Sequence, residues 1–155
     1  MKGDCPLEPA KSPARYTVDT DKDRLDVEVI HRFLTNSYWA AGIPLDIVRK
    51  SIANSLCFGV YEGQQQVGFA RVVSDYSTFA YVADVFILES HRGSGLAKRL
   101  MAAILMHPDL NGLRNWVLAT RDAHGLYARF GFRPLASPER FMEMHDSTAY
   151  SLDLF

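Results

Sequence analysis

The chain has 155 residues and a mass of 17.4 kDa, which suits one domain and is too short for two ordinary ones. An apolar fraction of 48% is enough for a buried core and excludes wholesale disorder. With 17 basic and 18 acidic residues the formal charge is -1, which argues against a general nucleic-acid binder because such a protein needs a basic surface. A local basic patch is still compatible with this charge.

The chain begins with a polar stretch. Residues 1–14 hold three of the seven prolines, and we interpret them as a flexible arm. No later linker, internal repeat or low-complexity tract follows. The sequence therefore predicts one domain over residues 15–155.

Hydrophobic periodicity predicts alternating strands and helices along this domain. Strands are expected over 16–19, 56–61, 67–73, 79–88 and 116–119, with further candidates over 132–135 and 141–144. Helices are expected after Asp21 or Asp23, after Pro44, from Leu96 and after Asp122. The strand over 79–88 is nearly all apolar, so we expect burial on both of its faces. This order predicts a mixed α/β arrangement around one sheet.

The loop 92–95, with the sequence Arg-Gly-Ser-Gly, is the sharpest local feature. It joins an apolar strand to a helix, and glycines at a helix N-terminus let a phosphate approach the free backbone N–H groups. A plain strand-to-helix turn would also need glycine. A P-loop is excluded because Lys98 does not follow a glycine, and the dinucleotide fingerprint is excluded because Lys98 stands where its third small residue belongs.

Two motifs resemble one known family. Residues 92–97 (Arg-Gly-Ser-Gly-Leu-Ala) match the R/Q-x-x-G-x-G/A motif of the GNAT superfamily of N-acetyltransferases, and residues 126–132 (Leu-Tyr-Ala-Arg-Phe-Gly-Phe) look like its L-Y-x-[KR]-x-G-F signature. Both occur in family order, and the resemblance, to a bacterial-type single-domain member, covers roughly residues 15–145. It implies an α/β (α+β) fold whose mixed, mostly antiparallel sheet of about 6–7 strands is flanked by about four helices.

The resemblance implies acetyl-CoA as co-substrate and no metal. The residues expected to bind the coenzyme are Val85, Phe86, Ile87, Arg92, Gly93, Ser94, Gly95, Leu96, Ala97 and Thr120. Many members carry an asparagine at the position of Thr120. A threonine hydroxyl can still form a hydrogen bond there, with fewer groups to offer.

For catalysis the resemblance favours Tyr127 as the general acid that protonates the departing thiolate, while ordinary helix packing is the competing interpretation. A phenol has a reference pKa near 10, above the value of about 8.5 of a cysteine-type thiol, so it is protonated at neutral pH. Asp84 is the one formal charge in its apolar strand. We interpret it either as the general base or as a structural residue, in a salt bridge or as a backbone cap. Tyr81, Glu89 and His124 are weaker candidates for the base, and a water chain is a further one.

The acceptor pocket is expected around Tyr38, Trp39 and Tyr81, although Tyr38 and Trp39 could instead cover the sheet edge. The sequence thus predicts an acetyl-CoA-dependent N-acetyltransferase. It would move an acetyl group to a primary amine of a small molecule or protein by direct attack in a ternary complex. The alternatives are a catalytically inactive module that binds or senses acyl-CoA, and a structural protein with an empty glycine loop.

Location and association are inferred from simple features. The chain has no apolar run near the roughly 20 residues of a membrane span and no signal-peptide pattern. Cys5 and Cys57 have no metal-binding spacing, so we expect reduced thiols in the cytoplasm. We expect no nucleic-acid or membrane partner. A homodimer is also expected from the resemblance, with the apolar end 150–155 adding a strand or an interface.

Overall fold

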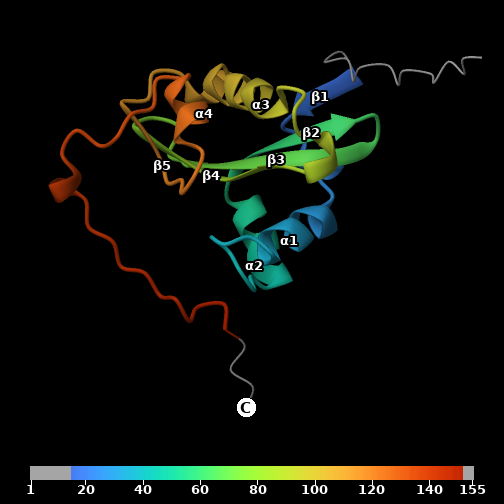
Figure 1. Cartoon of the computed structure of the whole chain (residues 1–155), viewed down its shortest axis with the longest axis horizontal. Helices are drawn as coiled ribbons and strands as arrows, with labels where there is room; N and C mark the ends of the chain where they lie inside the picture. Colours follow the sequence, from blue (N-terminus) through green and yellow to red (C-terminus); the bar gives the residue numbers. More distant parts are fainter. Residues whose placement is uncertain (1–14, 152–155) are drawn as a thin grey trace, which may run out of the picture.

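The computed structural model describes residues 15–151 and shows one central sheet (Figure 1). The strands are β1 (Tyr16–Asp19), β2 (Leu56–Glu62), β3 (Gln65–Ser74), β4 (Phe79–Ile87) and β5 (Asn115–Leu118). They lie in the order of the sequence, antiparallel from β1 to β4, and β5 joins β4 in parallel.

Helices cover both faces of the sheet. The helices are α1 (Val27–Thr35), α2 (Leu45–Ala53), α3 (Leu96–Leu105) and α4 (His124–Ala128). In Figure 1, α1 and α2 lie on one face while α3 and α4 lie on the other. Each pair closes its own apolar cluster against the sheet. Within residues 15–151, no helix is both long and apolar enough to cross a membrane.

The helix boundaries follow from local capping chemistry. The Asp26 side chain accepts a hydrogen bond from the backbone N–H of Val29 and starts α1, whereas Asp21 caps only the short 3-10 turn Lys22–Arg24. The prediction that Asp21 or Asp23 caps this helix was therefore wrong. Pro44 does precede α2, as predicted. At α4 the predicted Asp122 cap is wrong, because the N-cap residue is Ala123 and no side chain caps the helix. The N–H of Ala123 itself donates to the hydroxyl of Thr120.

A β-bulge in β4 changes which side chains face each layer. Ala80 and Val82 face the α3 cluster before the bulge, and Val85 and Ile87 face the same cluster after it. Strict alternation would put even and odd positions on opposite faces, so one extra residue must lie between Val82 and Val85. The pairing with β3 shifts at this place, and Asp84 has a φ of 55°, which is unusual for a residue other than glycine.

The observed sheet departs from the expectation in two places. It has five strands among the described residues, because 132–135 and 141–144 form no strand and pair with none. In addition, β4 is buried on both faces only near its end, since Phe79 and Tyr81 are exposed. The predicted burial of both faces of 79–88 was thus wrong for its first half.

After α4 the chain leaves the body of the protein as an extended arm (Figure 1). The arm begins beside β5 and returns at Tyr150, which packs against the cluster of α1 and α2. Its residues 138–149 are exposed. The N-terminal segment 1–14, which we predicted to be flexible, lies outside the described residues. The end 152–155 also lies outside them, so only the first two residues of the segment 150–155 are described.

Replacing Gly68 by alanine is expected to destabilise the protein by about 1–3 kcal/mol, because overpacking a filled core displaces its neighbours. A Cβ there would lie 2.6 Å from Cδ1 of Ile87 and 3.0 Å from the carbonyl oxygen of Phe86. Gly125→Ala is the matched control: its Cβ meets nothing within 4 Å, and alanine favours the helix by up to about 1 kcal/mol. Urea unfolding measures the stability of both variants, and equal stabilities would contradict the tight packing around Gly68.

Candidate functional site

The site begins where β4 and β5 separate. The two strands pair from Phe79 with Asn115 to Val82 with Leu118, and no pairing follows in the described part of the chain. Beyond this point β4 carries the bulge at Asp84, and β5 turns away toward α4. The edge of β4 over residues 83–87 is therefore left without a partner strand on the β5 side.

An ion pair fixes the bulge from one face of the sheet. Nε of Arg71 on β3 donates to Oδ2 of Asp84 at 2.8 Å, and Nε1 of Trp39 donates to Oδ1 at 3.0 Å. The Asp84 side chain is only 9% exposed, so its charge needs these partners. A further donor of Arg71 reaches the hydroxyl of Ser55 at 3.2 Å. Asp84 thus has the salt bridge that the sequence left open as an alternative to catalysis.

The glycine loop lies at the N-terminus of α3. Gly93 and Gly95 have φ angles of 84° and 73°, in the left-handed region where a side chain adds strain. A Cβ at either position would meet nothing within 4 Å, so the space over the backbone is open. The first turn of α3 holds no acidic residue and contains Lys98. A cation is unfavourable at a helix N-terminus, and a bound anion would offset it.

Polar contacts anchor this loop to the sheet. Nε of Arg92 donates to the carbonyl oxygen of Ile87 at 3.0 Å. One residue earlier, Nδ1 of His91 lies 3.2 Å from the hydroxyl oxygen of Tyr16 and 3.1 Å from Oε2 of Glu62. Burial raises the pKa of Tyr16, which therefore stays protonated as a donor. The start of the loop is thus tied to β1, β2 and β4 together.

Tyr127 faces the gap between the separating strands from α4. It is 9% exposed, and burial, with a smaller contribution from Tyr38, raises its pKa above the usual value. Its phenol therefore stays protonated well above neutral pH. Tyr127 is in edge contact with Phe132, the last residue of the second sequence motif.

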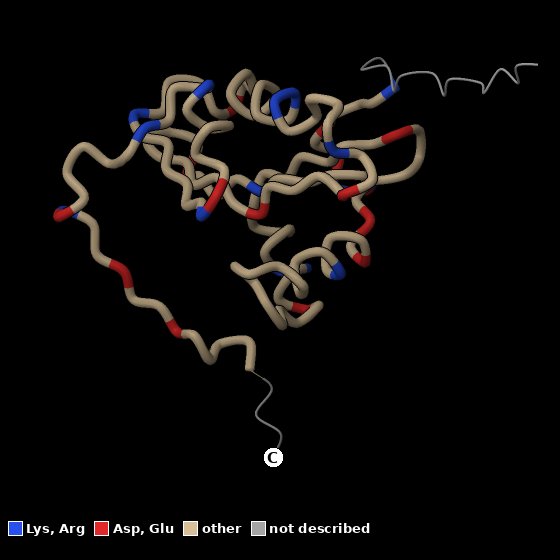
Figure 2. The backbone as a smooth tube through the Cα atoms, in the orientation of Figure 1, with Lys and Arg blue, Asp and Glu red and all other residues tan. Residues whose placement is uncertain are grey.

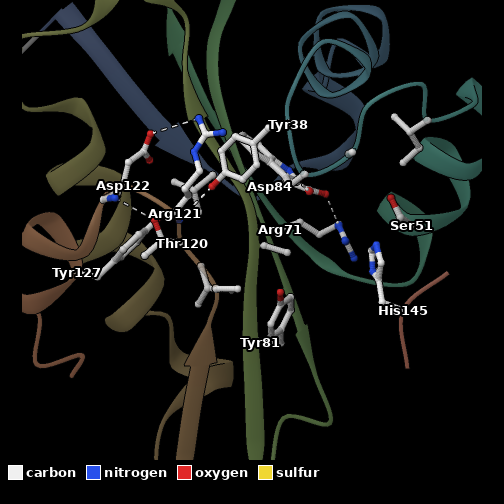
Figure 3. Close-up of a pocket in the computed structure, with 18 of the residues that line it drawn as sticks. Tyr38, Ser51, Arg71, Tyr81, Asp84, Thr120, Arg121, Asp122, Tyr127 and His145 are labelled. Atoms are coloured by element: carbon white, nitrogen blue, oxygen red, sulfur yellow. Dashed lines mark hydrogen bonds and ion pairs between the residues drawn. The ribbon is translucent and has the colours of Figure 1, made fainter. Parts of the chain in front are cut away.

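These elements surround a pocket of about 680 Å³ that reaches from the α4 side of the sheet to the α2 side. Figure 3 shows Tyr127 and Thr120 toward one side of the pocket, Arg71 and His145 toward the other, and Asp84 between them. The pocket is lined by predicted residues from several elements: Tyr38, Trp39, Tyr81, Asp84, Val85, Thr120 and Tyr127. The structure thus brings both predicted catalytic residues and all three predicted acceptor residues to one cavity.

Contacts between two loops bridge this pocket. The guanidinium of Arg121 lies 3.9 Å from the centre of the Tyr38 ring, and the backbone N–H of Arg121 donates to the Tyr38 hydroxyl at 3.2 Å. Arg121 follows β5, while Tyr38 lies between α1 and α2. The loops on the two faces of the sheet therefore meet at the gap between β4 and β5.

Some predicted residues lie elsewhere. Glu89 and His124, the weaker candidates for the base, are exposed and do not line the pocket. Sequence reasoning missed Arg71, Arg121 and His145. A signal was present for Arg71, because it is the only charge in the predicted strand over 67–73, as Asp84 is in its own strand. His145 lies on the arm, and nothing local in the sequence directs it to the pocket.

No metal centre is apparent in this region. Among residues 15–151, no group of three or more histidine, cysteine, aspartate or glutamate side chains is arranged to hold a metal ion. In the pocket the Asp84 carboxylate accepts from Arg71, and the hydroxyl oxygen of Thr120 accepts from the backbone N–H of Ala123.

Comparison with known proteins defines the class. The family model described as "Acetyltransferase (GNAT) domain" matches residues 53–134. A candidate acetyltransferase of Gibberella zeae is 30% identical over an alignment of 137 residues, and the match covers 74% of this chain and 76% of that protein. The chain belongs to the GNAT acetyltransferase family, as the two sequence motifs indicated.

Solved structures agree with this assignment. A GNAT-family protein from Xanthomonas campestris pv. campestris superposes with a TM-score of 0.85 and 52% identity, covering 88% of this chain and 96% of that one. A protein from Clostridium acetobutylicum, solved with acetyl-CoA, gives a TM-score of 0.59 at 15% identity over 84% of this chain and 94% of its own. The second likeness shows the fold alone.

Replacing Arg71 by methionine is expected to destabilise the protein by about 3–5 kcal/mol, because it leaves the Asp84 carboxylate buried without its cation. Adding Asp84→Asn removes that charge and should restore more than half of the loss. The control is Asp122→Asn, whose partner Arg121 is 3.8 Å away in an exposed pair and whose loss should leave stability nearly unchanged. Urea denaturation measures the free energy of unfolding of each variant. If the effects of the two single substitutions simply add in the double variant, the result argues against the ion pair.

Proposed function

We propose that this chain is an acetyl-CoA-dependent N-acetyltransferase that acetylates a primary amine by direct attack within a ternary complex. The observation that carries the proposal is the unpaired edge of β4 at the bulge, which lies between the open glycine loop and Tyr127. Membership of the GNAT acetyltransferase family supports acetyl transfer in general.

The residues present fit the coenzyme. The open left-handed glycines of the loop 92–95, the start of α3 without a side-chain cap, and the cation Lys98 suit a pyrophosphate. Residues 85–87 would offer backbone groups to the pantetheine arm, and Thr120 its hydroxyl hydrogen, since its oxygen already accepts from Ala123. When bound, acetyl-CoA supplies the acetyl group as a thioester.

The bulge supports a role for Val85 in stabilising developing charge. A backbone N–H at this unpaired edge could donate to the carbonyl oxygen as it becomes negative, which is the arrangement of an oxyanion hole. This N–H needs no rearrangement to donate, because the Arg71–Asp84 ion pair already holds the backbone of the bulge in place. Removal of one such donor in other enzymes slows catalysis by about 10²–10³-fold.

Two side chains would carry out the proton transfers, Tyr127 as general acid and Asp84 as general base. Tyr127, kept protonated by its raised pKa, would donate a proton to the departing thiolate. Asp84 accepts from Arg71 and Trp39, and a carboxylate has about four lone-pair sites, so further sites are left for the acceptor's ammonium proton. We therefore retain Asp84 as the base, acting directly or through a water molecule, with Trp39 as its orienting donor.

The pocket on the α2 side would take the acceptor. Tyr38, Trp39 and Tyr81 give it aromatic walls, which suit the alkyl part of an amine and a cation. A volume of about 680 Å³ admits a small amine or a single side chain of a protein. The acceptor is thus expected to be a compact primary amine or an exposed amine at the end of a flexible chain.

Two further expectations are retained as proposals. A cytoplasmic location is supported by Cys57, a buried thiol without a disulfide partner among the described residues. Homodimer formation is supported by the exposed apolar arm after α4.

Calorimetric titration with acetyl-CoA should give saturable one-to-one binding, and Gly95→Ala should weaken it by about tenfold. A left-handed backbone costs an alanine about 1–2 kcal/mol, and 1.4 kcal/mol corresponds to a factor of ten. Gly112→Ala is the matched control, because Gly112 has a φ of 77° and open space but lies at the other end of α3. Absence of binding at millimolar coenzyme would refute the proposed cofactor.

Tyr127→Phe is expected to lower kcat by about 10²–10⁴-fold while the KM for acetyl-CoA changes little. In the wild-type protein kcat should also fall as the pH rises above 10, because the acid form of Tyr127 is then lost, and the variant should lack this fall. Steady-state transfer to a panel of amines measures both. The exposed Tyr76→Phe serves as control.

The same assay separates an enzyme from an inactive acyl-CoA sensor. A sensor would bind acetyl-CoA and transfer nothing to any amine of the panel. Equal rates for Tyr127→Phe and the wild type would show that Tyr127 is not the general acid.

A further inference from the structure

The guanidinium of Arg71 has donors in the pocket that its structural role does not use. A guanidinium carries five N–H groups in one plane. Nε donates to the Asp84 carboxylate, and one N–H of Nη1 donates to the hydroxyl of Ser55. Within residues 15–151 the remaining N–H groups form no hydrogen bond, although the side chain is only 19% exposed and lines the pocket. Donors in such a place are costly unless water or a ligand accepts from them.

His145 adds a second donor at the same end of the pocket. Figure 3 shows both side chains toward the α2 side, away from Tyr127, and both line the pocket. An imidazole offers one N–H donor when it is neutral and two when it is charged. The α2 side therefore presents a planar cation and a histidine to whatever binds there.

Few carboxylates lie near these two donors. Among the described residues that line the pocket, Asp84 and Asp122 are the acidic ones. Asp122 lies on the opposite side from Arg71 in Figure 3, and it pairs with Arg121 at 3.8 Å. Figure 2 shows further acidic positions along the arm after α4, but no acidic residue of the arm lines the pocket. Asp84 is thus the one carboxylate beside Arg71 among these lining residues.

One carboxylate cannot neutralise two cations. A simple alkylamine arrives at neutral pH mostly as an ammonium, so Asp84 would face that ammonium and the Arg71 guanidinium at once. Two like charges close together at low dielectric oppose each other. An acceptor with a carboxylate of its own would leave the α2 side neutral, and that carboxylate would accept from the unused N–H groups of Arg71.

The position of Arg71 beside Asp84 sets the spacing of charges within the acceptor. Nε of Arg71 lies 2.8 Å from Oδ2 of Asp84, so an amine beside Asp84 and an anion on the guanidinium would be neighbours. An α-amino acid, whose carboxylate is attached to the carbon that bears the amine, has this spacing. A carboxylate at the far end of a long chain does not. The exposed side chains of Tyr38, Trp39 and Ile47 are left to contact an apolar side chain of the amino acid.

On the basis of the function proposed above, we propose that the acceptor is an α-amino acid with an apolar side chain. Its carboxylate binds the guanidinium of Arg71 and the imidazole of His145, while its amine contacts Asp84. The amine nitrogen forms a bond to the acetyl carbon, and the C–S bond of the thioester breaks. The ammonium loses two protons on becoming an amide. One is balanced by the proton that the sulfur gains through Tyr127, and the other passes to solvent through Asp84.

Transfer to leucine, leucinamide and isopentylamine tests the inference on the wild-type protein. The three acceptors have the same alkyl group, but only leucine carries a carboxylate. An α-amino group beside an amide has a pKa near 8, so more of leucinamide is the reactive free amine at neutral pH. Intrinsic reactivity thus favours the amide, whereas the site should give leucine a kcat/KM about 10–100-fold higher than either analogue, mainly through KM.

Two substitutions test the residues that would bind the carboxylate. His145→Ala should raise the KM for leucine by about three- to tenfold and leave transfer to isopentylamine nearly unchanged. Glu143→Ala, at an exposed position of the same arm that does not line the pocket, is the matched control and should change neither. Arg71→Lys keeps a cation beside Asp84 but loses the planar fork. It should reduce the preference for leucine over leucinamide by about tenfold or more, and circular dichroism checks that it is folded.

Calorimetric titration of the protein saturated with coenzyme A separates this inference from the proposed function, because binding requires no transfer. Leucine should bind this complex at least tenfold more tightly than leucinamide or isopentylamine. If amines are acetylated but leucine and leucinamide bind and react equally well, the assignment of an α-amino acid is overturned while the proposed function stands. A preference for glutamate over leucine would overturn the apolar side chain. Absence of acetyl-CoA binding would overturn both the proposed function and this inference.

Discussion

The site depends on one backbone constraint, the left-handed conformation of Asp84 in the middle of a buried strand. A strand keeps its side chains on alternate faces, and only an extra residue can change that alternation. In β4 the change occurs at Asp84, so that Val82 and Val85 both face α3. A residue other than glycine persists in this conformation only where its surroundings hold it. Here Arg71 and Trp39 hold it through the carboxylate.

Because of the bulge, β4 contributes residues to a possible binding site on each face of the sheet. On the α3 side, β4 continues into the glycine loop, whose open backbone precedes a helix N-terminus. On the α2 side, the bulge presents Asp84 to an aromatic pocket, and the gap beside β5 admits Tyr127 from the opposite layer. A coenzyme on one face and an acceptor on the other would then meet at a single point. This geometry would suit the proposed transfer between two bound molecules.

The sequence predicted those parts of the fold whose cause is local. Pro44 marks the start of α2, and the motif at 92–95 identifies a loop whose glycines do have left-handed backbones. The start of α1 was misplaced because three aspartates lie close together, and the one that caps the helix, Asp26, is selected by tertiary contacts such as that between its N–H and Gln66. Segments 132–135 and 141–144 have strand-like composition, but a strand also needs an edge to pair with, which composition does not reveal.

The residues of the site were likewise predicted only where the sequence itself carries a local signal for them. Tyr127, Asp84 and the aromatic residues Tyr38 and Trp39 stood out by motif or by a charge in an apolar run. Arg71 was overlooked although it is a lone cation in the apolar strand next to that of Asp84. Two lone opposite charges in adjacent apolar strands favour an ion pair. His145 could not be predicted, because its place depends on the path of the whole arm after α4.

We propose that the bulge and the glycine loop bind one acetyl-CoA molecule together. Correlation spectra of the ¹⁵N-labelled protein, recorded during titration with acetyl-CoA, test this proposal most directly. We expect the amide signals of Val85, Gly93 and Gly95 to shift and saturate together. Coenzyme A without the acetyl group should move the loop signals but affect Val85 less. Saturating loop shifts with an unchanged Val85 signal in both titrations would contradict the placement of the thioester at the bulge.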